Sequence, residues 1–324
     1  MSGMRMDSTR VAFLETLAEI MEADPKTVVV FADSVKVFRA GPAFLEQFAG
    51  RVFDVGIAEQ NMVATAAGLA TCGLTVFVAT YAGFITMRAC EQVRTFVGYP
   101  GLNVKFIGAN AGIFGGEREG VTHQFFEDLA IVRSIPGVTV VVPADAAAVR
   151  QATRAIAKVT GPAYLRIGSG RDPVVVDPPR PFELGKIRRL EEHGRDFVIF
   201  ANGYLLQRSL EAAARLKFQG LRGRVVEVHT LRPLDVEGIA RVLAETPAAV
   251  TIEDHQINGA LGSAIAEVIA EHGTGRLVRL GLQDVFAESG DAFDLLDRYG
   301  LGVQDIVQAV ERVASKAVVT AEKP

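Results

Sequence analysis

The 324-residue sequence has little net charge and no concentrated charge of either sign. Its 34 Lys and Arg residues nearly balance 38 Asp and Glu residues, which leaves a formal charge of −4 at pH 7. No run of Lys and Arg stands out along the chain. Because nucleic acids and acidic membrane surfaces are bound through concentrated positive charge, we expect neither as a partner.

Long apolar runs and a recognisable export signal are also missing. Residues 1–10 are polar, the next segment is amphipathic, and no apolar stretch is long enough to cross a bilayer. Cys72 and Cys90 are the only cysteines, and neither has a nearby His that would make it a nucleophile. They fit reduced thiols in apolar helices better than a disulfide. We therefore expect a cytoplasmic protein without a membrane span.

Alternating helix and strand patterns fill most of the chain. A hydrophobic content of 49% in 324 residues is enough for two domains with separate cores. Continuous apolar strands separated by helical segments favour parallel sheets covered on both faces, which is the α/β class. The predicted strands lie near residues 27–31, 76–78, 104–107, 138–142, 164–167, 197–200, 225–228 and 249–252.

The alternation stops once, in the middle of the chain. Between Gly170 and Pro181 the sequence is rich in Asp and Pro, which predicts an extended linker. We therefore predict a first domain over residues 1–170, a linker over residues 171–184 and a smaller α/β domain over residues 185–324.

Glu59 is the first candidate for a functional carboxylate. An apolar segment at residues 52–55 runs into Gly56, and the helical segment that follows carries no charge from Met62 to Leu74. Glu59 should lie in the first turn of this helix, where free backbone N–H groups and the helix dipole favour a carboxylate. Such a placement is common in ordinary helices. A carboxylate at the start of a buried helix, however, needs a partner.

The sequence around Glu59 resembles a known signature. Gly56-Ile57-Ala58-Glu59-Gln60-Asn61-Met62, preceded by residues 51–55, is similar to the pyrimidine-binding domain of transketolases and deoxyxylulose-phosphate synthases. In that family the matching Glu bonds a ring nitrogen of the aminopyrimidine of thiamine diphosphate. The resemblance therefore implies that Glu59 binds this cofactor and has a catalytic role, for which a desolvated carboxyl group is suited.

Further motifs resemble the cofactor pocket of the family. Ala32-Asp33 follows the first predicted strand, as in the family's Ala-Asp-Leu, whose Asp lies beside the cofactor. Residues 80–84, followed by residues 88–93, are similar to aromatic-Ala-Ala-Phe and Arg-Ala-x-Asp-Gln. The resemblance implies that Tyr81 and Phe84 form the aromatic pocket and that Phe84 stacks on the ring. Without the resemblance, both side chains would be read as ordinary core residues.

Two other motifs resemble the family's substrate contacts. Thr9-Arg10-Val11-Ala12 is similar to Thr-Arg-x-Ala, whose Arg reaches the phosphate end of the sugar through a forked guanidinium. Residues 120–124 are similar to Gly-Pro-Thr-His-Gln, so His123 is implied to face the substrate and to bond it or transfer a proton. On their own, an Arg on a first helix is usually solvated and a lone His is usually structural.

Several substrate positions depart from the family pattern. Residues 116–120 replace Gly-Glu-Asp-Gly and put Glu119 in place of the Asp that reads a sugar hydroxyl. Asn110 replaces a His that helps to hold the substrate. The family's phosphate-binding Arg would fall near Ser169, with Arg166 and Arg171 as candidate replacements. These changes favour an unusual pentose or a modified ketose over an ordinary sugar phosphate.

The sequence also contains no Gly-Asp-Gly, the family motif that holds a divalent cation against the cofactor's diphosphate. The resemblance nevertheless continues into residues 251–263, which are like the family's carboxy-terminal domain. It therefore implies a split transketolase whose separate amino-terminal subunit holds Mg²⁺ (or Ca²⁺), with thiamine diphosphate bound between the subunits. A pair of heterodimers is expected by analogy and from the prevalence of twofold symmetry.

The resemblance implies that the chain moves a two-carbon ketol unit from a ketose to an aldose. A second interpretation is the β subunit of the first component of a 2-oxoacid dehydrogenase, but the usual Tyr-His-Ser-Gln pattern is missing and residues 56–60 are transketolase-like. A third is a non-catalytic subunit that uses the fold as an interaction surface, because fold alone does not fix function.

Overall fold

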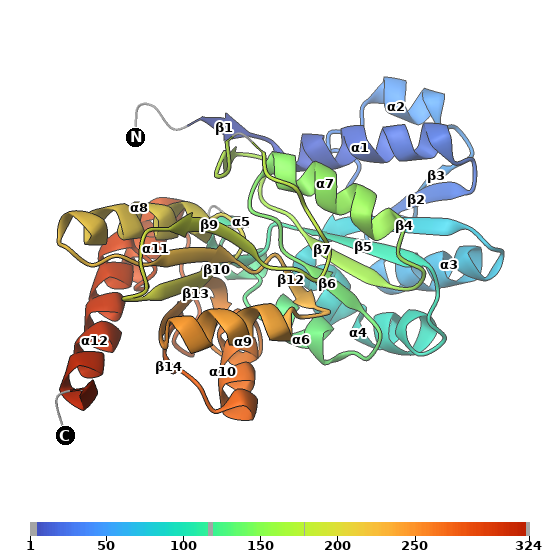
Figure 1. The fold of residues 1–324 in the computed structure, drawn as a ribbon. Helices are drawn as coiled ribbons and strands as arrows, with labels where there is room; N and C mark the ends of the chain where they lie inside the picture. The colour runs from blue at the N-terminus through green and yellow to red at the C-terminus, as the bar shows by residue number, and fades with distance from the viewer. Residues whose placement is uncertain (1–4, 116–118, 178, 322–324) are drawn as a thin grey trace.

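The computed structural model describes residues 5–115, 119–177 and 179–321, with side chains as far as residue 315. Two mainly parallel sheets lie in the described chain, and helices cover both faces of the larger one (Figure 1). This arrangement confirms the predicted α/β class.

The larger sheet has seven strands in the order β12-β6-β7-β5-β4-β2-β3. Every neighbouring pair is parallel except β12 and β6, which are antiparallel. The central strands are buried along most of their length, as their continuous apolar sequence predicted. The bounds are β2 Thr27–Phe31, β3 Val52–Asp54, β4 Thr75–Tyr81, β5 Val104–Ala109, β6 Thr139–Val141, β7 Ala163–Arg166 and β12 Thr230–Arg232.

Two layers of helices bury the faces of this sheet. On one face α1 and α7 cover side chains of β2, β4 and β5, and on the other α3, α6 and the π-helical turns η1 and η2 pack against the alternate side chains. The bounds are α1 Thr9–Ala23, α2 Pro42–Gln47, α3 Glu59–Thr71, η1 Phe84–Arg88, α4 Cys90–Gln92, η2 Val93–Gly98, α5 Gly112–Gly115, η3 Gly120–Thr122, α6 Asp128–Ser134 and α7 Ala146–Ala157.

The smaller sheet has five strands in the order β14-β13-β10-β11-β9, and only β9 runs antiparallel to its neighbour. Its strands are β9 Arg188–Glu192, β10 Val198–Ala201, β11 Arg224–Glu227, β13 Ala248–Gln256 and β14 Arg276–Leu282. Its helices are α8 Leu205–Phe218, α9 Val236–Glu245, α10 Leu261–His272, α11 Ala292–Arg298 and α12 Val303–Ala321.

The two halves of the chain are interlocked more closely than the sequence indicates. Strand β12 comes from the second half, yet it completes an edge of the larger sheet by pairing with β6. Short strands β1 (Met6–Asp7) and β8 (Asp172–Pro173) also pair, which ties the predicted linker to the start of the chain. One apolar cluster includes side chains of both sheets. The halves therefore share part of their core.

Each predicted strand is present, with shifts of a few residues at its ends. Cys72 and Cys90 are both free thiols, as predicted, the first exposed and the second half-buried. Among the helices of the described residues, none combines the length and the apolar character that a membrane crossing requires.

Candidate active site

The candidate site lies at the carboxyl-terminal edge of the larger sheet. Asp33 lies two residues after β2, Tyr81 ends β4 and Asn110 directly follows β5, and these three strands are neighbours. Glu59 begins the helix that follows β3 on the other side of β2. Open parallel sheets place ligands at this edge, because the carboxyl ends of their strands meet there. The fold therefore brings these four predicted site residues to one edge.

Glu59 is the first residue of α3, as predicted, and it is only 1% exposed. Its Oε2 accepts a hydrogen bond of 2.7 Å from Nη1 of Arg88. Arg88 is half-exposed, and its guanidinium carbon lies 4.1 Å from the centroid of the Phe84 ring. The buried carboxylate therefore has a charged partner that also lies over an aromatic face.

An aromatic cluster that includes Phe84 adjoins this ion pair. The Tyr81 and Phe84 ring centroids are 5.5 Å apart, and the His123 ring lies 5.0 Å from Tyr81 and 5.5 Å from Phe84. Phe125 lies 5.3 Å from Phe84, and all these pairs are edge-to-face. Gly83 makes the packing possible, because a Cβ there would lie 1.9 Å from Cδ1 of Phe125. The structure thus brings Tyr81, Phe84 and His123 together.

Arg10 lies beside this cluster, at the start of α1. Its Nη2 donates to Oδ1 of Asn110. Burial lowers the pKa of Arg10, while Tyr81, Asp172 and Glu119 act in the opposite direction. These electrostatic contacts place Arg10, Tyr81 and Glu119 in one neighbourhood. Glu119 is exposed, and residues 116–118 of the altered motif lie outside the described residues.

Arg171 lies on the same side as Arg10. Asp172 fixes its loop by accepting hydrogen bonds from the Thr9 hydroxyl (2.6 Å) and from the Gly170 N–H (3.1 Å). A Cβ on Gly170 would lie 3.3 Å from Cδ of Arg10, and Arg171 is exposed next to it. Arg171 therefore remains a candidate substrate contact.

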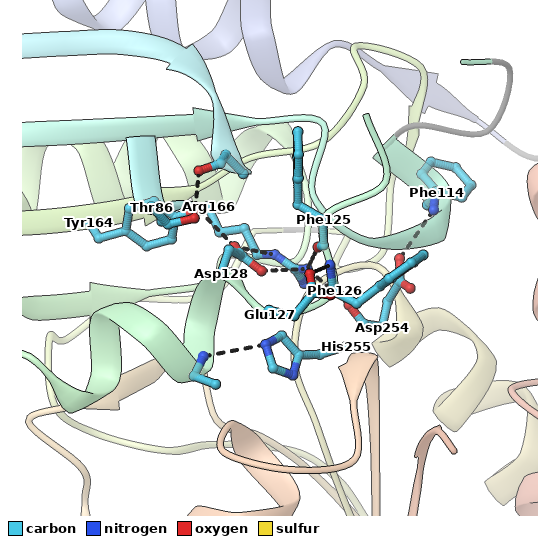
Figure 2. Close-up of polar contacts among 12 residues, drawn as sticks. Thr86, Phe114, Phe125, Phe126, Glu127, Asp128, Tyr164, Arg166, Asp254 and His255 are labelled. Atoms are coloured by element: carbon cyan, nitrogen blue, oxygen red, sulfur yellow. Dashed lines mark hydrogen bonds and ion pairs between the residues drawn. The ribbon is translucent and has the colours of Figure 1, made fainter. Parts of the chain in front are cut away.

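Arg166, one of the two candidate replacements for the family's phosphate-binding Arg, is held by groups of the chain itself. Its side chain is 8% exposed, and both oxygens of the fully buried Asp128 accept hydrogen bonds of 3.1 Å from it (Figure 2). Its Nη2 also donates to the carbonyl oxygens of Asp254 (2.9 Å) and Phe125 (3.3 Å). Asp128 already compensates the charge of Arg166. Through its bond to the carbonyl of Asp254, Arg166 links the two halves of the chain.

Arg88 is the main residue that the sequence reasoning missed. In the sequence it appears as part of the motif at residues 88–93, which implies no separate role for it. Its contact with Glu59 joins residues 29 positions apart and comes from a π-helical turn, η1, which helical periodicity does not reveal. The signal available in the sequence is that Arg88 lies only four residues after Phe84, a predicted pocket residue. The structure adds that both residues lie in one π-helical turn, and such turns are frequent at functional sites.

The described residues contain no group of three or more His, Cys, Asp or Glu side chains that could hold a metal ion. The polar groups of the site are instead one buried carboxylate, one imidazole and a few guanidinium and amide groups around an aromatic cluster. This set suits a planar nitrogenous ring and a polyhydroxylated substrate.

The fold and the site define an α/β protein with a buried helix-start carboxylate beside an aromatic pocket. Comparison with protein families identifies its class. Residues 6–170 match the family described as transketolase, pyrimidine binding domain, and residues 185–306 match transketolase, C-terminal domain. The chain therefore belongs to the transketolase family, which confirms the resemblance found in the sequence.

Curated relatives support the same class. The chain is 39% identical over 305 residues to a "Putative transketolase C-terminal section" of Methanocaldococcus jannaschii, covering 93% of this chain and 94% of that protein. It is 38% identical over 308 residues to "6-deoxy-6-sulfo-D-fructose transketolase subunit SqwH" of Clostridium sp., covering 95% and 94%. These relatives favour the transketolase interpretation over the 2-oxoacid dehydrogenase alternative.

Solved structures agree with the domain order. A "Split gene transketolase, inactive beta4 tetramer" superposes with a TM-score of 0.88 at 39% identity, covering 95% of this chain and 99% of that one. A transketolase from Pichia stipitis superposes with a TM-score of 0.79 at 19% identity, where this chain spans 46% of the other chain's length. The second likeness concerns the fold alone.

Proposed function

We propose that this chain is the carboxy-terminal subunit of a two-component transketolase that uses thiamine diphosphate. It transfers a two-carbon ketol unit from a ketose to an aldose. One observation carries the proposal: a single planar nitrogenous group, the guanidinium of Arg88, bonds the buried carboxylate of Glu59 and at the same time has its central carbon 4.1 Å from the centroid of the Phe84 ring.

The residues of the site fit the cofactor's aminopyrimidine. This ring is planar and carries nitrogen donors and acceptors at its edge, as a guanidinium does. Glu59 would hold the ring nitrogen, and Tyr81 and Phe84 would flank the ring, with Asp33 beside it at the end of β2. Stacking on an aromatic side chain adds roughly 0.5–1.5 kcal/mol beyond area burial.

When bound, thiamine diphosphate supplies the carbon nucleophile that adds to the ketose carbonyl. Glu59 contributes by holding a proton at the ring nitrogen inside a site that excludes water from its carboxyl group. His123 lies against Tyr81 and Phe84, where its ring can bond a sugar oxygen or move a proton to it. These residues account for cofactor activation and for substrate orientation.

The far end of the sugar is assigned to polar groups around Arg10. Asn110 accepts a hydrogen bond from Arg10, and Glu119 is close enough to raise the pKa of Arg10 against the effect of burial. Arg171 is exposed on the adjoining loop. Relatives named for 6-deoxy-6-sulfo-D-fructose and for apulose-4-phosphate support a modified ketose as the donor.

A separate amino-terminal subunit completes the proposed enzyme. The sequence has no Gly-Asp-Gly, so the residues that hold Mg²⁺ (or Ca²⁺) and the diphosphate are assigned to that partner. Relatives described as a subunit and as a C-terminal section support this division. Two such heterodimers related by a twofold axis make the simplest closed assembly.

The decisive experiment is Glu59→Gln in the reconstituted two-subunit complex. This change keeps the shape of the side chain but removes the proton-holding carboxyl group, so ketol transfer should fall by at least ~100-fold. Glu46→Gln, on the exposed surface of α2, serves as the matched control. Size-exclusion chromatography should show the complex intact in both variants.

Undiminished turnover in Glu59→Gln would overturn the catalytic assignment. A second measurement tests the division of the enzyme: the native chain, isolated gently from its own cells, should bring a stoichiometric partner containing Gly-Asp-Gly together with thiamine diphosphate. Recovery of the chain without a partner and without the cofactor would favour the non-catalytic interpretation.

A further inference from the structure

The loop between β2 and α2 holds Arg39 in a fixed position. Phe38 is fully buried, and its ring centroid lies 5.6 Å from that of Phe13 and 5.9 Å from that of Phe31. The N–H of Arg39 donates to the carbonyl of Lys36 at 3.2 Å. The backbone of Arg39 is therefore anchored to the core, while its side chain is exposed.

Arg39 has a backbone conformation that its residue type rarely adopts. Its φ is 62°, in the left-handed region that favours glycine. In the described part of the chain, four non-glycine residues have a positive φ: Asp33, Arg39, Asn110 and Asp284. Asp33 and Asn110 lie at the carboxyl-terminal edge of the larger sheet, and Arg39 lies in the loop that leaves this edge after β2. Such strained residues gather where function requires the side chain.

The same loop is tied to Arg10. Nη1 of Arg10 donates to the carbonyl of Val37 at 3.3 Å, two residues before Arg39. After burial, the charge of Arg39 is a further cause that lowers the pKa of Arg10, so the two guanidinium groups are close enough to repel. A conformation that costs backbone strain and also holds two like charges together is unfavourable in itself, and an anion bound to both would offset the repulsion.

Both guanidinium groups retain capacity for a ligand. No ion pair or hydrogen bond of the Arg39 side chain occurs among the described residues. Within the same residues, Nε of Arg10 is buried without a hydrogen-bond partner. Glu119, which also acts on Arg10, and the buried Asp172 are the acidic groups near this pair. Asp172 already accepts hydrogen bonds from Thr9 and from its own loop.

We propose that Arg39 and Arg10 together bind the terminal oxyanion of the sugar, a phosphate or a sulfonate group. Arg39 thereby supplies a cationic contact in a site where Asn110 stands in place of the family's His and Ser169 near the place of its phosphate-binding Arg. Guanidinium forks match the oxygens of a tetrahedral oxyanion. This inference rests on the proposed function and names the class of substrate that the site selects.

The test compares three ketoses in the reconstituted two-subunit complex: fructose 6-phosphate, 6-deoxy-6-sulfofructose and fructose. Arg39→Gly removes the guanidinium and relieves the left-handed strain, so the variant should fold at least as well as the wild type. We expect the ratio of kcat/KM for the better anionic ketose to that for fructose to fall roughly 10–100-fold, which is the range for one lost charge-assisted contact.

The pattern of losses identifies the source of the oxyanion. If the natural substrate carries a sulfonate, 6-deoxy-6-sulfofructose is the better anionic substrate of the wild type and loses most in the variant; if it carries a phosphate, fructose 6-phosphate does. Lys36→Ala, an exposed cation of the same loop, is the matched control and should keep the wild-type ratio. Arg39→Lys keeps the charge and should recover part of the preference.

A measurement without turnover separates this inference from the proposed function. Inorganic phosphate and sulfate should raise the melting temperature of the full chain, and Arg39→Gly should abolish the increase while Lys36→Ala preserves it. An increase that persists in Arg39→Gly, or an unchanged preference for the anionic ketose, overturns the role of Arg39. Failure of ketol transfer alone, with phosphate or sulfate stabilisation still dependent on Arg39, counts against the proposed function instead.

Discussion

Nη1 of Arg88 lies 2.7 Å from Oε2 of Glu59, and the same guanidinium lies over the ring of Phe84. The carboxylate is 1% exposed, whereas the Arg88 side chain is 44% exposed. A ring that bonds Glu59 and stacks on Phe84 uses the same two contacts. The cofactor ring proposed for this site would therefore have to move Arg88 or share the Glu59 carboxylate with it.

The first prediction concerns the stability that this ion pair provides. Arg88→Ala leaves the Glu59 carboxylate buried without its cation. Breaking a fully buried pair costs about 3–5 kcal/mol, and the half-exposed Arg88 reduces this to about 1–2 kcal/mol because solvent screens its charge. Urea unfolding of the purified chain measures the loss.

The double variant Glu59→Gln with Arg88→Ala provides the control. It removes the buried charge together with its partner, so it should recover most of the lost stability. Equal unfolding free energies for Arg88→Ala and the wild type would show that solvent, and not Arg88, compensates the carboxylate.

Local sequence patterns predicted the positions of some site residues correctly. The placement of Glu59 at a helix start and of Asp33 after the first strand depends on short motifs and on the period of apolar residues. The gathering of these positions then follows from parallel pairing, because strand ends meet at one edge. Their individual roles stay predictions until the variants are measured.

Contacts between distant segments could not be predicted in this way. Strand β12 joins the first sheet across the predicted domain boundary, and its three residues carry no distinctive period. Arg166 has the same local sequence context whether it faces a substrate or a buried Asp128 from another element. Arg39 is distinguished by its positive φ, and a positive φ at a non-glycine residue cannot be predicted from the sequence.

The second prediction concerns the joint between the halves of the chain. Asp128→Asn removes the carboxylate that pairs with the buried guanidinium of Arg166 and leaves only the charge of Asp254 acting on it, which should cost about 3 kcal/mol of unfolding free energy. Tyr164→Phe is the matched control, because it removes only the 2.7 Å hydrogen bond to Asp128 and should cost about 1 kcal/mol. Equal losses in the two variants would show that Asp128 is not what compensates Arg166.

The third prediction concerns pH and starts from two buried groups near the end of β11. Burial raises the pKa of Glu227 to about 7 from 4.5, although Arg188 opposes the shift. Burial, assisted by Arg188, lowers the pKa of His229 to about 3 from 6.5. Oε1 of Glu227 is buried without a partner among the described residues, so a proton can be held there.

The two groups act on stability in opposite directions. Between pH 4.5 and about 7 the folded protein holds a proton on Glu227 that the unfolded chain releases, so stability falls as pH rises through this window. Between pH 6.5 and about 3 the unfolded chain holds a proton on His229 that the folded protein excludes, so stability falls as pH decreases. The contributions of the two groups to the slope of unfolding free energy against pH therefore cancel where the windows overlap, from pH 4.5 to 6.5.

Glu227→Gln removes one of these slopes and leaves the other. The variant should lose stability more steeply than the wild type on acidification from pH 6.5 to 4.5, by up to roughly 3 kcal/mol over the window. It should also lack the decline that the wild type shows between pH 6.5 and about 7. Urea unfolding at half-unit pH steps measures both profiles, with Glu237→Gln on the exposed face of α9 as the control that should follow the wild type. Parallel profiles for Glu227→Gln and the wild type would mean that Glu227 is ionised in the folded protein throughout this range, with Arg188 outweighing the cost of burial.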